Sequence, residues 1–447
     1  MADSRNTAVA RVRDLIAQTD GGALTSFLEP LHPADIAEVL DALDQEEKVL
    51  ILRHLGTEKA AEVLTEVDEH SGQALLALLS NTDVVSLLGE MPSDDAVDII
   101  TALPPEKSKQ VDALLPSAER QKIHDLMEFE EDTAGGIMEI EKVAVRESAT
   151  VQDAIDLVRT LADEIENLEE VYVVDRDDRL VGEIPVLDLL FNKPSEKVTD
   201  VMKDNVITVP VEMDQEEVAA LFGKYDEFVL PVVDDTGKLV GRITVDDIID
   251  VLEEEASEDI ARIVGTQEDE IGERSPIKIS KARLPWLVIA MFGQLINALI
   301  MNHYAVSIET FITLVFFIPL VIGTAGGTGI QAAVVVVREI ALGQIVVTQI
   351  GRRVFREIQV TLMNGLVLGV ILFGIVYVWL GDVGLGLLLL TTLVSVSLTS
   401  ALMGTVIPLV LNRTRIDPAI ATGPFITVLS DIIGLVIYLA YATFYLS

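Results

Sequence analysis

Residues 284–302 read Leu-Pro-Trp-Leu-Val-Ile-Ala-Met-Phe-Gly-Gln-Leu-Ile-Asn-Ala-Leu-Ile-Met-Asn, an apolar stretch without a charged residue. Four more apolar stretches follow it, at 311–336, 358–380, 385–411 and 418–446. A hydrocarbon core of roughly 30 Å needs about 20 helical residues, so each stretch predicts one membrane-spanning helix. The sequence therefore predicts an all-α transmembrane domain of five helices over residues 276–447.

The charge of the chain changes sign at Pro276. Nine Lys and Arg stand against six Asp and Glu from that point on, whereas the region Met1 to Ser275 carries 23 against 66, a net charge of −43. Such an acidic region repels phosphate backbones, so we expect no nucleic acid partner and expect cations instead. The chain has no cysteine, which excludes disulfides, thiolate metal sites and a Cys nucleophile.

Lys and Arg lie on only one side of the predicted membrane helices. They precede the first span and occupy the loops after the second and fourth spans, while the other loops and the tail have none. Cytoplasmic loops are enriched in Lys and Arg, so we expect a multi-pass protein of the cell (inner) membrane with a cytoplasmic N-terminus and an extracytoplasmic C-terminus. The polar start, Met1 to Leu15, has no apolar signal-peptide core, which agrees with an acidic region in the cytoplasm.

One acidic residue stands near the middle of a predicted span, namely Asp431 in Thr427-Val-Leu-Ser-Asp-Ile-Ile-Gly434. A carboxylate at that depth is costly unless it faces water, a cation or a polar partner. The alternative is an Asp that caps or hydrogen-bonds a neighbouring helix. No Lys or Arg occurs at matching depth in another span, which favours a cation as the partner.

The second span contains Gly323-Thr-Ala-Gly-Gly-Thr-Gly-Ile-Gln331. Such a run loosens a helix and can expose carbonyl groups beside a cavity, but it also allows close helix packing. Combined with Asp431 it suggests a pore wall of backbone and hydroxyl oxygens, with Gly326, Thr328 and Gly329 at the transport site. We interpret the amides Gln294, Asn297 and Asn364 as hydrogen bonds between helices rather than as ion ligands.

Residues 139–257 contain an internal repeat. The segment Val173-Val-Asp-Arg-Asp-Asp-Arg-Leu-Val-Gly-Glu-Ile-Pro-Val-Leu-Asp188 returns as Val232-Val-Asp-Asp-Thr-Gly-Lys-Leu-Val-Gly-Arg-Ile-Thr-Val-Asp-Asp247. Each copy reads as strand, polar turn, strand and helix, with a helical stretch before it. The pattern predicts a tandem α/β module and resembles a pair of cystathionine-β-synthase (CBS) domains, which bind adenine nucleotides or ions.

In the CBS family the segment G-x-I-[TP]-x-x-D supplies a Thr and an Asp to a ribose. The resemblance therefore implies a nucleotide site, with ATP as the expected cofactor, at Asp188, Phe228, Thr244 and Asp247. The first copy departs from the pattern because Pro185 stands where the Thr would be. The alternative is that Asp188 and Asp247 only cap the helices that follow them.

The remaining parts of the acidic region complete the domain prediction. Residues 22–130 read as helices separated by Pro and Gly turns, and the pattern from Asp35 to Glu46 loosely recurs from Asp95 to Glu106. Such recurrence predicts stacked helical hairpins in an all-α superhelical domain. The predicted parts are a flexible N-terminus at 1–21, the helical domain at 22–130, CBS domains at 131–197 and 198–257, and a connecting helix with its linker at 246–275.

Acidic residues gather in several clusters between Met1 and Ser275. Carboxylate oxygens are hard ligands that suit Mg²⁺ or Ca²⁺, and the sequence has no EF-hand loop for tight Ca²⁺ binding. A solvated acidic face, or adaptation to a saline cytoplasm, remains an alternative explanation for each cluster.

The whole chain resembles the MgtE family of bacterial magnesium channels. The resemblance lies in the order of the parts and in three strings, E-F-E-E-D-T-A-G-G-I-M from Glu128, T-V-D-D-I-I-D-V-L from Thr244 and D-P-A-I-A-T-G-P-F-I-T-V-L-S-D from Asp417. It implies a homodimer whose connecting helix, here about 246–265, plugs the pore while Mg²⁺ holds the acidic cytoplasmic domains together.

The resemblance also assigns residues. It implies that Asp431 is the acid of the selectivity site and that Asp417, at the inner mouth of the pore, meets the acids of the plug helix through an ion. The implied sensor carboxylates are Asp95, Asp214, Glu216, Asp226, Asp247, Asp250, Glu255, Glu258 and Asp259, and the acidic clusters of the sequence add Asp94, Asp98 and Glu254. The chain departs from the family pattern at Gly327, Ile330 and Gly423, where the family has Asn, which removes polar side chains from the expected pore.

The sequence thus predicts a Mg²⁺-selective channel, gated closed by intracellular Mg²⁺, with membrane lipid and a second copy as partners. A broader divalent-cation transporter for Mn²⁺ or Co²⁺ is the first alternative. A membrane-anchored ion or nucleotide sensor without transport is the second. An enzyme is the weakest interpretation, because the sequence has no phosphate-binding loop, no H-E-x-x-H motif and no nucleophile–base set.

Overall fold

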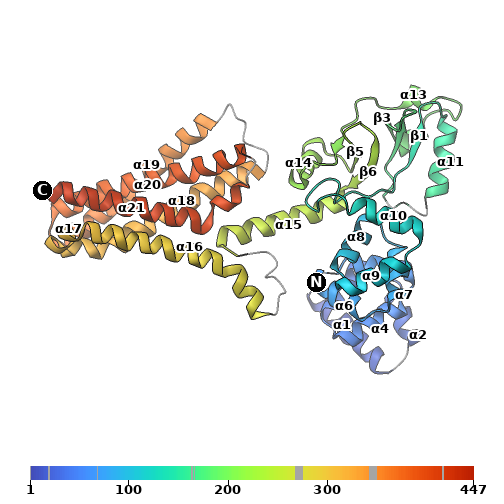
Figure 1. Cartoon of the computed structure of the whole chain (residues 1–447), viewed down its shortest axis with the longest axis horizontal. Helices are drawn as coiled ribbons and strands as arrows, with labels where there is room; N and C mark the ends of the chain where they lie inside the picture. Colours follow the sequence, from blue (N-terminus) through green and yellow to red (C-terminus); the bar gives the residue numbers. More distant parts are fainter. Residues whose placement is uncertain are drawn as a thin grey trace. The chain divides into compact units, whose positions relative to one another are not determined.

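The computed structural model describes residues 2–18, 21–67, 69–162, 165, 167–266, 275–341, 350–414 and 417–446. They form two compact units, Met1–Leu252 and Glu253–Ser447. The first unit holds the helical domain and two small sheets, and the second holds the long apolar helices (Figure 1). The predicted fold class is confirmed.

Ten short helices begin the first unit. They are α1 (Ala2–Ala17), α2 (Gly21–Leu28), α3 (Pro33–Asp41), α4 (Gln45–His54), α5 (Thr57–Thr65), α6 (Glu69–Leu78), α7 (Asn81–Leu88), α8 (Ser93–Ala102), α9 (Pro105–Leu114) and α10 (Ser117–Leu126). Capping boxes start two of them, with Asp44 paired to Glu47 and Ser80 paired to Asp83. Helix α3 packs on α5, α5 on α7, and α7 on α9, which is the arrangement of stacked hairpins.

The predicted flexible N-terminus is wrong for residues 2–17. These residues form α1, which packs on α2 and α3. The side chains of Val9, Val12 and Leu15 are buried there. Apolar residues three positions apart lie on one face of a helix, and this face adds to the core.

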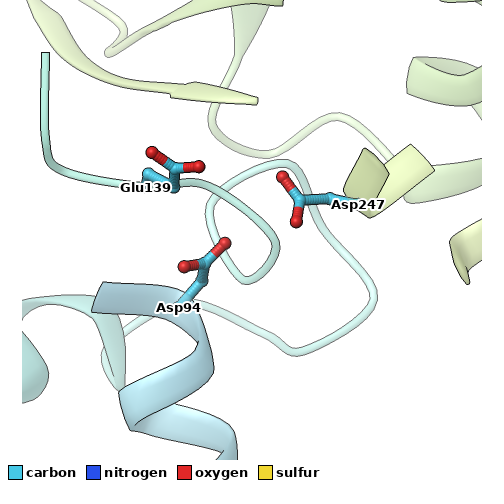
Figure 2. A group of neighbouring side chains, drawn as sticks. All are labelled: Asp94, Glu139 and Asp247. Atoms are coloured by element: carbon cyan, nitrogen blue, oxygen red, sulfur yellow. The ribbon is translucent and has the colours of Figure 1, made fainter. Parts of the chain in front are cut away.

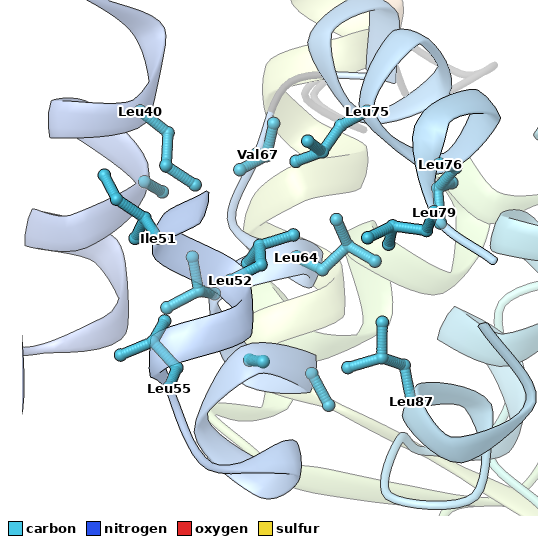
Figure 3. Packing of buried hydrophobic residues seen from close by; sticks show 14 of the residues in the cluster. Leu40, Ile51, Leu52, Leu55, Leu64, Val67, Leu75, Leu76, Leu79 and Leu87 are labelled. Atoms are coloured by element: carbon cyan, nitrogen blue, oxygen red, sulfur yellow. The ribbon is translucent and has the colours of Figure 1, made fainter. Parts of the chain in front are cut away.

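One apolar core joins the helices of this domain. Figure 3 shows Leu40, Ile51, Leu64, Leu75 and Leu87, from five successive helices α3 to α7, within the same cluster. Burying a side chain of this size contributes about 1.5–3 kcal/mol relative to leaving it exposed. Burial of apolar surface between neighbouring hairpins therefore holds the short helices, which are too short to be stable alone.

The two sheets have the same topology. Their elements are β1 (Ala144–Arg146), α11 (Val151–Leu161), β2 (Glu170–Val174), β3 (Leu180–Pro185), α12 (Val186–Leu189), α13 (Val198–Val201), β4 (Val209–Pro210), α14 (Gln215–Tyr225), β5 (Val229–Val233), β6 (Leu239–Thr244) and α15 (Val245–Val264). In each sheet the middle strand pairs parallel with the first strand and antiparallel with the third. This shared order agrees with the predicted tandem α/β module.

Segments near the predicted domain borders are exchanged between the two modules. Glu139 and Arg242 exchange backbone hydrogen bonds at 2.8 and 2.9 Å, and Met138 lies in the core of the second module. Val198 in turn lies in the core of the first module. The borders at 131–197 and 198–257 stay a prediction along the sequence, while in space residues 133–140 complete the second module and residue 198 packs in the first.

The second unit holds the membrane helices. Its elements are α16 (Pro276–His303), α17 (Ala305–Thr310), η2 (Ile312–Phe317), α18 (Ile318–Ala341), α19 (Ile350–Leu380), α20 (Val383–Arg413), η4 (Pro418–Ala421) and α21 (Gly423–Leu446). Five helices in the described part of the chain are long and apolar enough to cross a membrane, one for each predicted stretch. Helix α20 packs against α18, α19 and α21, and α16 packs against α21.

Candidate ion pathway and acidic sensor sites

Asp431 lies on α21 and is 5 % exposed. Its Oδ2 accepts a hydrogen bond from Nε2 of Gln294 on α16 at 3.1 Å. Its Oδ1 faces Gly326 of α18, where a methyl group would lie 3.2 Å from that oxygen. The carboxylate is thus oriented by a neutral amide and stands where three membrane helices meet.

The glycine run of the second span does not loosen its helix. Helix α18 is continuous from Ile318 to Ala341, so its carbonyl groups take part in the regular bonds of the helix. Gly326 packs against Thr427, and Gly329 packs against Ser430, whose Oγ would be 2.7 Å from a methyl group at Gly329. The predicted loosening of the helix is therefore not found, and the close packing agrees with the alternative, while the transport role of Gly326 and Gly329 stays a prediction.

Thr328 has a local partner of its own. Its hydroxyl donates to the carbonyl oxygen of Thr324, one turn earlier in α18, at 2.8 Å. The hydroxyl oxygen can still accept a hydrogen bond, so the transport role of Thr328 stays a prediction.

Asp417 begins η4 and pairs with an arginine. Its Oδ1 accepts the N–H of Ala419 at 2.7 Å, and its Oδ2 forms an ion pair with Arg262 near the end of α15. Arg262 also pairs with Glu258, one turn earlier in the same helix. A guanidinium therefore occupies the position between plug-helix acid and Asp417 that the family resemblance assigned to an ion.

Sequence reasoning missed Arg262. The only signal was its spacing of four residues after Glu258, which is a common pair on helix surfaces and carries little information. The contact with Asp417 joins residues 155 positions apart and comes from the tertiary structure.

Gly423 has a structural reason for being glycine. Its φ is +56°, and its α-carbon faces the carbonyl oxygen of Ile263 so closely that any side chain would collide with it. Asn tolerates a positive φ but could not fit against this carbonyl. The departure from the family pattern thus allows the end of α15 to lie against the start of α21.

Three carboxylates converge in the first unit. Asp94 comes from α8, Glu139 from the segment before β1, and Asp247 from α15, as Figure 2 shows. One oxygen of each lies within 4.8 Å of the others. Asp94 and Glu139 are 8 % and 7 % exposed. This acid cluster offers the hard oxygen ligands that Mg²⁺ prefers.

Burial and mutual repulsion perturb these acids. Burial, followed by the charges of Asp247, Asp95 and Glu139, raises the pKa of Asp94 well above its usual range. Burial, followed by the charge of Asp247, raises the pKa of the neighbouring Asp95 to about 8. Burial raises the pKa of Glu139 to about 7 and that of Asp247 to about 6. A cation between these groups would relieve both the repulsion and the lost hydration.

Two partners orient the cluster. Arg242 donates from Nη2 and Nε to Oε2 of Glu139 at 2.7 and 3.0 Å in a buried ion pair. Thr244 donates its hydroxyl to Oδ2 of Asp247 at 2.6 Å. In addition, Oδ1 of Asp94 is buried and has no hydrogen-bond partner within the described part of the chain. An orphaned carboxylate oxygen beside two oriented carboxylates fits a bound divalent cation.

Glu139 was absent from the predicted sensor set. It stands outside the acidic clusters of the sequence, and only the exchange of residues 133–140 between the modules brings it beside Asp247. The pKa of Asp95 responds to the charges of Asp98 and Asp250 as well as Asp247, which places those predicted acids around the same region.

Three other predicted sensor residues belong to α14. Asp214 accepts the N–H of Glu216 at 2.9 Å as the N-cap, and Asp226 ends the helix with a φ of 56°. These positions have ordinary structural roles in starting and ending a helix, and the structure does not bring them into the acid cluster.

The last predicted sensor acids, Glu254, Glu255, Glu258 and Asp259, lie along α15. Burial, followed by the charge of Glu255, raises the pKa of Asp259. Together with Arg262, these residues give the end of α15 several acids and one arginine.

The predicted nucleotide residues separate into two pairs. In the second copy, Asp247 accepts both the hydroxyl and the N–H of Thr244, as the capping alternative expects. An anionic ligand at Asp247 would also lie beside the acid cluster. In the first copy, the pKa of Glu170 responds to the charges of Glu227 and Asp188, which places each of them within electrostatic reach of Glu170. Phe228, next to Glu227, is 65 % exposed.

Family models match most of the chain. The MgtE model, described as a divalent cation transporter, matches residues 318–441, and the MgtE intracellular N domain matches residues 31–132. CBS domains match residues 134–193 and 198–254.

Whole-length relatives and a solved structure agree with these matches. The chain is 35 % identical to the magnesium transporter MgtE of Thermus thermophilus, over 96 % of this chain and 97 % of the relative. It is 32 % identical to the magnesium transporter MgtE of Bacillus subtilis, over 94 % and 93 %. A crystal structure of the cytosolic domain of the Mg²⁺ channel MgtE in complex with ATP is 36 % identical, covers 54 % of this chain and 99 % of its own, and has a TM-score of 0.53. The transmembrane helices, the paired CBS modules, the helical domain and this similarity over nearly the full length establish that the chain belongs to the MgtE family of magnesium transporters.

Proposed function

We propose that this protein carries Mg²⁺ across the membrane along a route past Asp431. The observation that carries the proposal is a buried carboxylate within an apolar helix, held by a neutral amide and by no basic residue of the part of the chain that the structure describes. Mg²⁺ gives up its water reluctantly, so the ion would meet Asp431 largely hydrated. The membrane potential assists entry by about 2.3 kcal/mol per charge per 100 mV, and twice that for a divalent ion.

The proposed working unit is a homodimer with a cytoplasmic N-terminus and an extracytoplasmic C-terminus. The position of Lys and Arg in alternate loops supports the orientation. Paired Asp431 side chains around a twofold axis would give the ion two carboxylates in place of one.

We further propose that cytoplasmic Mg²⁺ closes the route by binding the acid cluster of Asp94, Glu139 and Asp247. The raised pKa values of these residues support the proposal, because they report burial and, after it, repulsion between the acids, and a bound cation would offset both. Binding can switch the protein only if the closed state holds the ion more tightly than the open state.

The second candidate is a broader divalent-cation transporter. It is favoured by Gly327 and Ile330 in α18, which provide no side-chain amide to the route where the family pattern has Asn. Without those groups, discrimination among divalent ions depends on the carboxylate and on the polar groups of the other helices.

The proposed nucleotide site lies between Asp188 of the first CBS module and Phe228 of the second. The exposed aromatic ring of Phe228 and the carboxylate of Asp188 suit an adenine ring and a ribose, respectively. The crystal structure of a related cytosolic domain in complex with ATP supports the same ligand. When bound, ATP would bring negatively charged phosphate groups, which the protein must accommodate beside the carboxyl group of Glu170.

Ion flux into liposomes tests the transport proposal. Asp431→Ala should abolish Mg²⁺ uptake, whereas Asp382→Ala, which removes an aspartate that caps α20, should leave uptake near that of the wild type. Competition with Mn²⁺, Co²⁺ and Ca²⁺ in the same vesicles separates Mg²⁺ selectivity from the broader alternative. Unchanged uptake by Asp431→Ala would refute the assigned route.

A further inference from the structure

We infer that Gln294 is a positioning residue for transport, which fixes the Asp431 carboxylate and is itself fixed by Asn297. This inference rests on the proposed role of Asp431. All three residues lie in the second unit, with Gln294 and Asn297 on α16 and Asp431 on α21.

The hydrogen bonds define one direction for the network. An ionised carboxylate can only accept, so Gln294 must present its amide N–H₂ to Asp431, at 3.1 Å. Its carbonyl oxygen Oε1 is then turned to the other side, where it accepts from Nδ2 of Asn297 at 3.2 Å. The carboxylate therefore fixes the orientation of the Gln294 amide, and Gln294 fixes the orientation of the Asn297 amide. We call this pair of hydrogen bonds, from Asn297 through Gln294 to Asp431, the relay.

Helix packing holds the relay in place. Gly293 and Asn297 are the buried residues of α16, whereas most of that helix is exposed in this chain. A side chain at Gly293 would collide with Val428 of α21. This close approach of α16 and α21 is what allows Gln294, the next residue, to reach Asp431.

The far end of the relay offers an acceptor. Oδ1 of Asn297 is buried and has no hydrogen-bond partner among the residues that the structure describes. Buried acceptors are normally satisfied, and a buried water molecule that fixes Asn297 from its far side can be the donor. Of the two amides, Gln294 alone contacts the carboxylate, and Asn297 orients Gln294.

A double-mutant cycle on flux through the full-length protein tests the inference. Gln294→Met keeps the length of the side chain and removes the donor, and it should raise KM for Mg²⁺ about tenfold with maximal flux within about twofold, as for partners that orient metal ligands. Asn297→Leu should raise KM less. The double variant should resemble Gln294→Met, because Asn297 acts through Gln294. Asn364→Leu, an exposed amide on α19, is the matched control and should keep the wild-type KM.

The outcomes separate positioning from packing and from failure of the transport proposal. Additive effects of the two substitutions, or a fall in maximal flux without a change in KM, would show that the amides only pack the helices. A wild-type KM for Gln294→Met, with flux still abolished in Asp431→Ala, would overturn the inference and leave the route intact. If Asp431→Ala itself transports Mg²⁺, the proposed function fails first.

Discussion

The two units of this protein bury carboxylates in opposite ways. In the first unit Asp94, Glu139 and Asp247 lie together, with one oxygen of each within 4.8 Å of the others. In the second unit Asp431 is surrounded by apolar helices and is held by an amide. The cluster of the first unit concentrates negative charge, whereas the apolar helices of the second unit isolate the single charge of Asp431.

The difference teaches what each arrangement can do with a cation. Acids that repel one another store unfavourable energy, so binding a cation changes the preferred conformation, which a sensor needs. A carboxylate that is already oriented can meet an ion without rearrangement, and a site for passage must release the ion again. Clustering suits regulation, and isolation suits conduction.

The largest expected effect separates the two arrangements. Asp431→Asn should abolish flux yet leave unchanged the hydrogen-exchange protection that Mg²⁺ gives to α8 and residues 133–140. In Asp94→Asn, the same segments should be protected from hydrogen exchange even without Mg²⁺, because one repelling charge is gone. Their protection should equal that of the wild type with Mg²⁺. Hydrogen exchange of the full-length protein with and without Mg²⁺ measures both. Equal Mg²⁺ responses of wild type and Asp94→Asn would contradict the sensor role of the cluster.

A smaller effect is expected at Arg262, where an arginine takes the place proposed for an ion. Arg262→Gln leaves Glu258 and Asp417 without their shared partner, so the end of α15 should be held less firmly. We expect flux at high internal Mg²⁺ to rise several-fold, since losing a charge-assisted pair costs roughly 1 kcal/mol at a partly exposed site. The exchanged pair Arg262→Asp with Asp417→Arg should restore part of the closure. No rise in flux would show that the pair does not hold the closed state.

Helix packing around the isolated carboxylate predicts a change in stability. A methyl group at Gly404 of α20 would collide with the carbonyl oxygen of Gly329 on α18. Gly404→Ala should therefore destabilise the second unit by about 1–3 kcal/mol, seen as a lower midpoint of thermal unfolding in detergent. Gly374→Ala is the matched control, since its methyl group would meet nothing within 4 Å, and it should be neutral or stabilising.

The smallest expected effect concerns pH and a half-buried acid outside the cluster. Burial, followed by the charge of Glu183, raises the pKa of Glu170 from 4.5 to about 7. The folded state thus favours the protonated form, so the first CBS module should lose about 1–2 kcal/mol of stability as the pH rises from 4.5 through 7.

Substitution at Glu170 checks the sign. Glu170→Gln should be more stable than the wild type at pH 8. Below pH 4.5 the stability of the variant should change with pH in the same way as that of the wild type. Hydrogen exchange of peptides covering β2 and β3 follows this module alone, and Glu147→Gln, an exposed glutamate of the same module, is the control. A wild type that is equally stable at pH 4.5 and pH 8 would contradict the raised pKa of Glu170, which burial and then the charge of Glu183 cause.

Much of the fold could be predicted from the sequence. The five membrane helices follow from local hydropathy, because each apolar stretch is long enough to cross a membrane. The two sheets follow from the segment that occurs twice in tandem. The same local signals misjudged residues 2–17, because the buried face of α1 is recognisable only when α2 and α3 are there to cover it.

The sequence by itself determined that one carboxylate, Asp431, must lie within the membrane, and that the acidic region attracts cations, because the costs of burying and of crowding charge do not depend on the details of folding. Only the tertiary structure decided which groups surround those charges. Glu139 joins Asp247 through exchanged segments, Arg262 reaches Asp417, and Gln294 reaches Asp431. Each contact joins residues that are distant in the chain, and such pairings depend on how helices and strands pack rather than on the residues beside them.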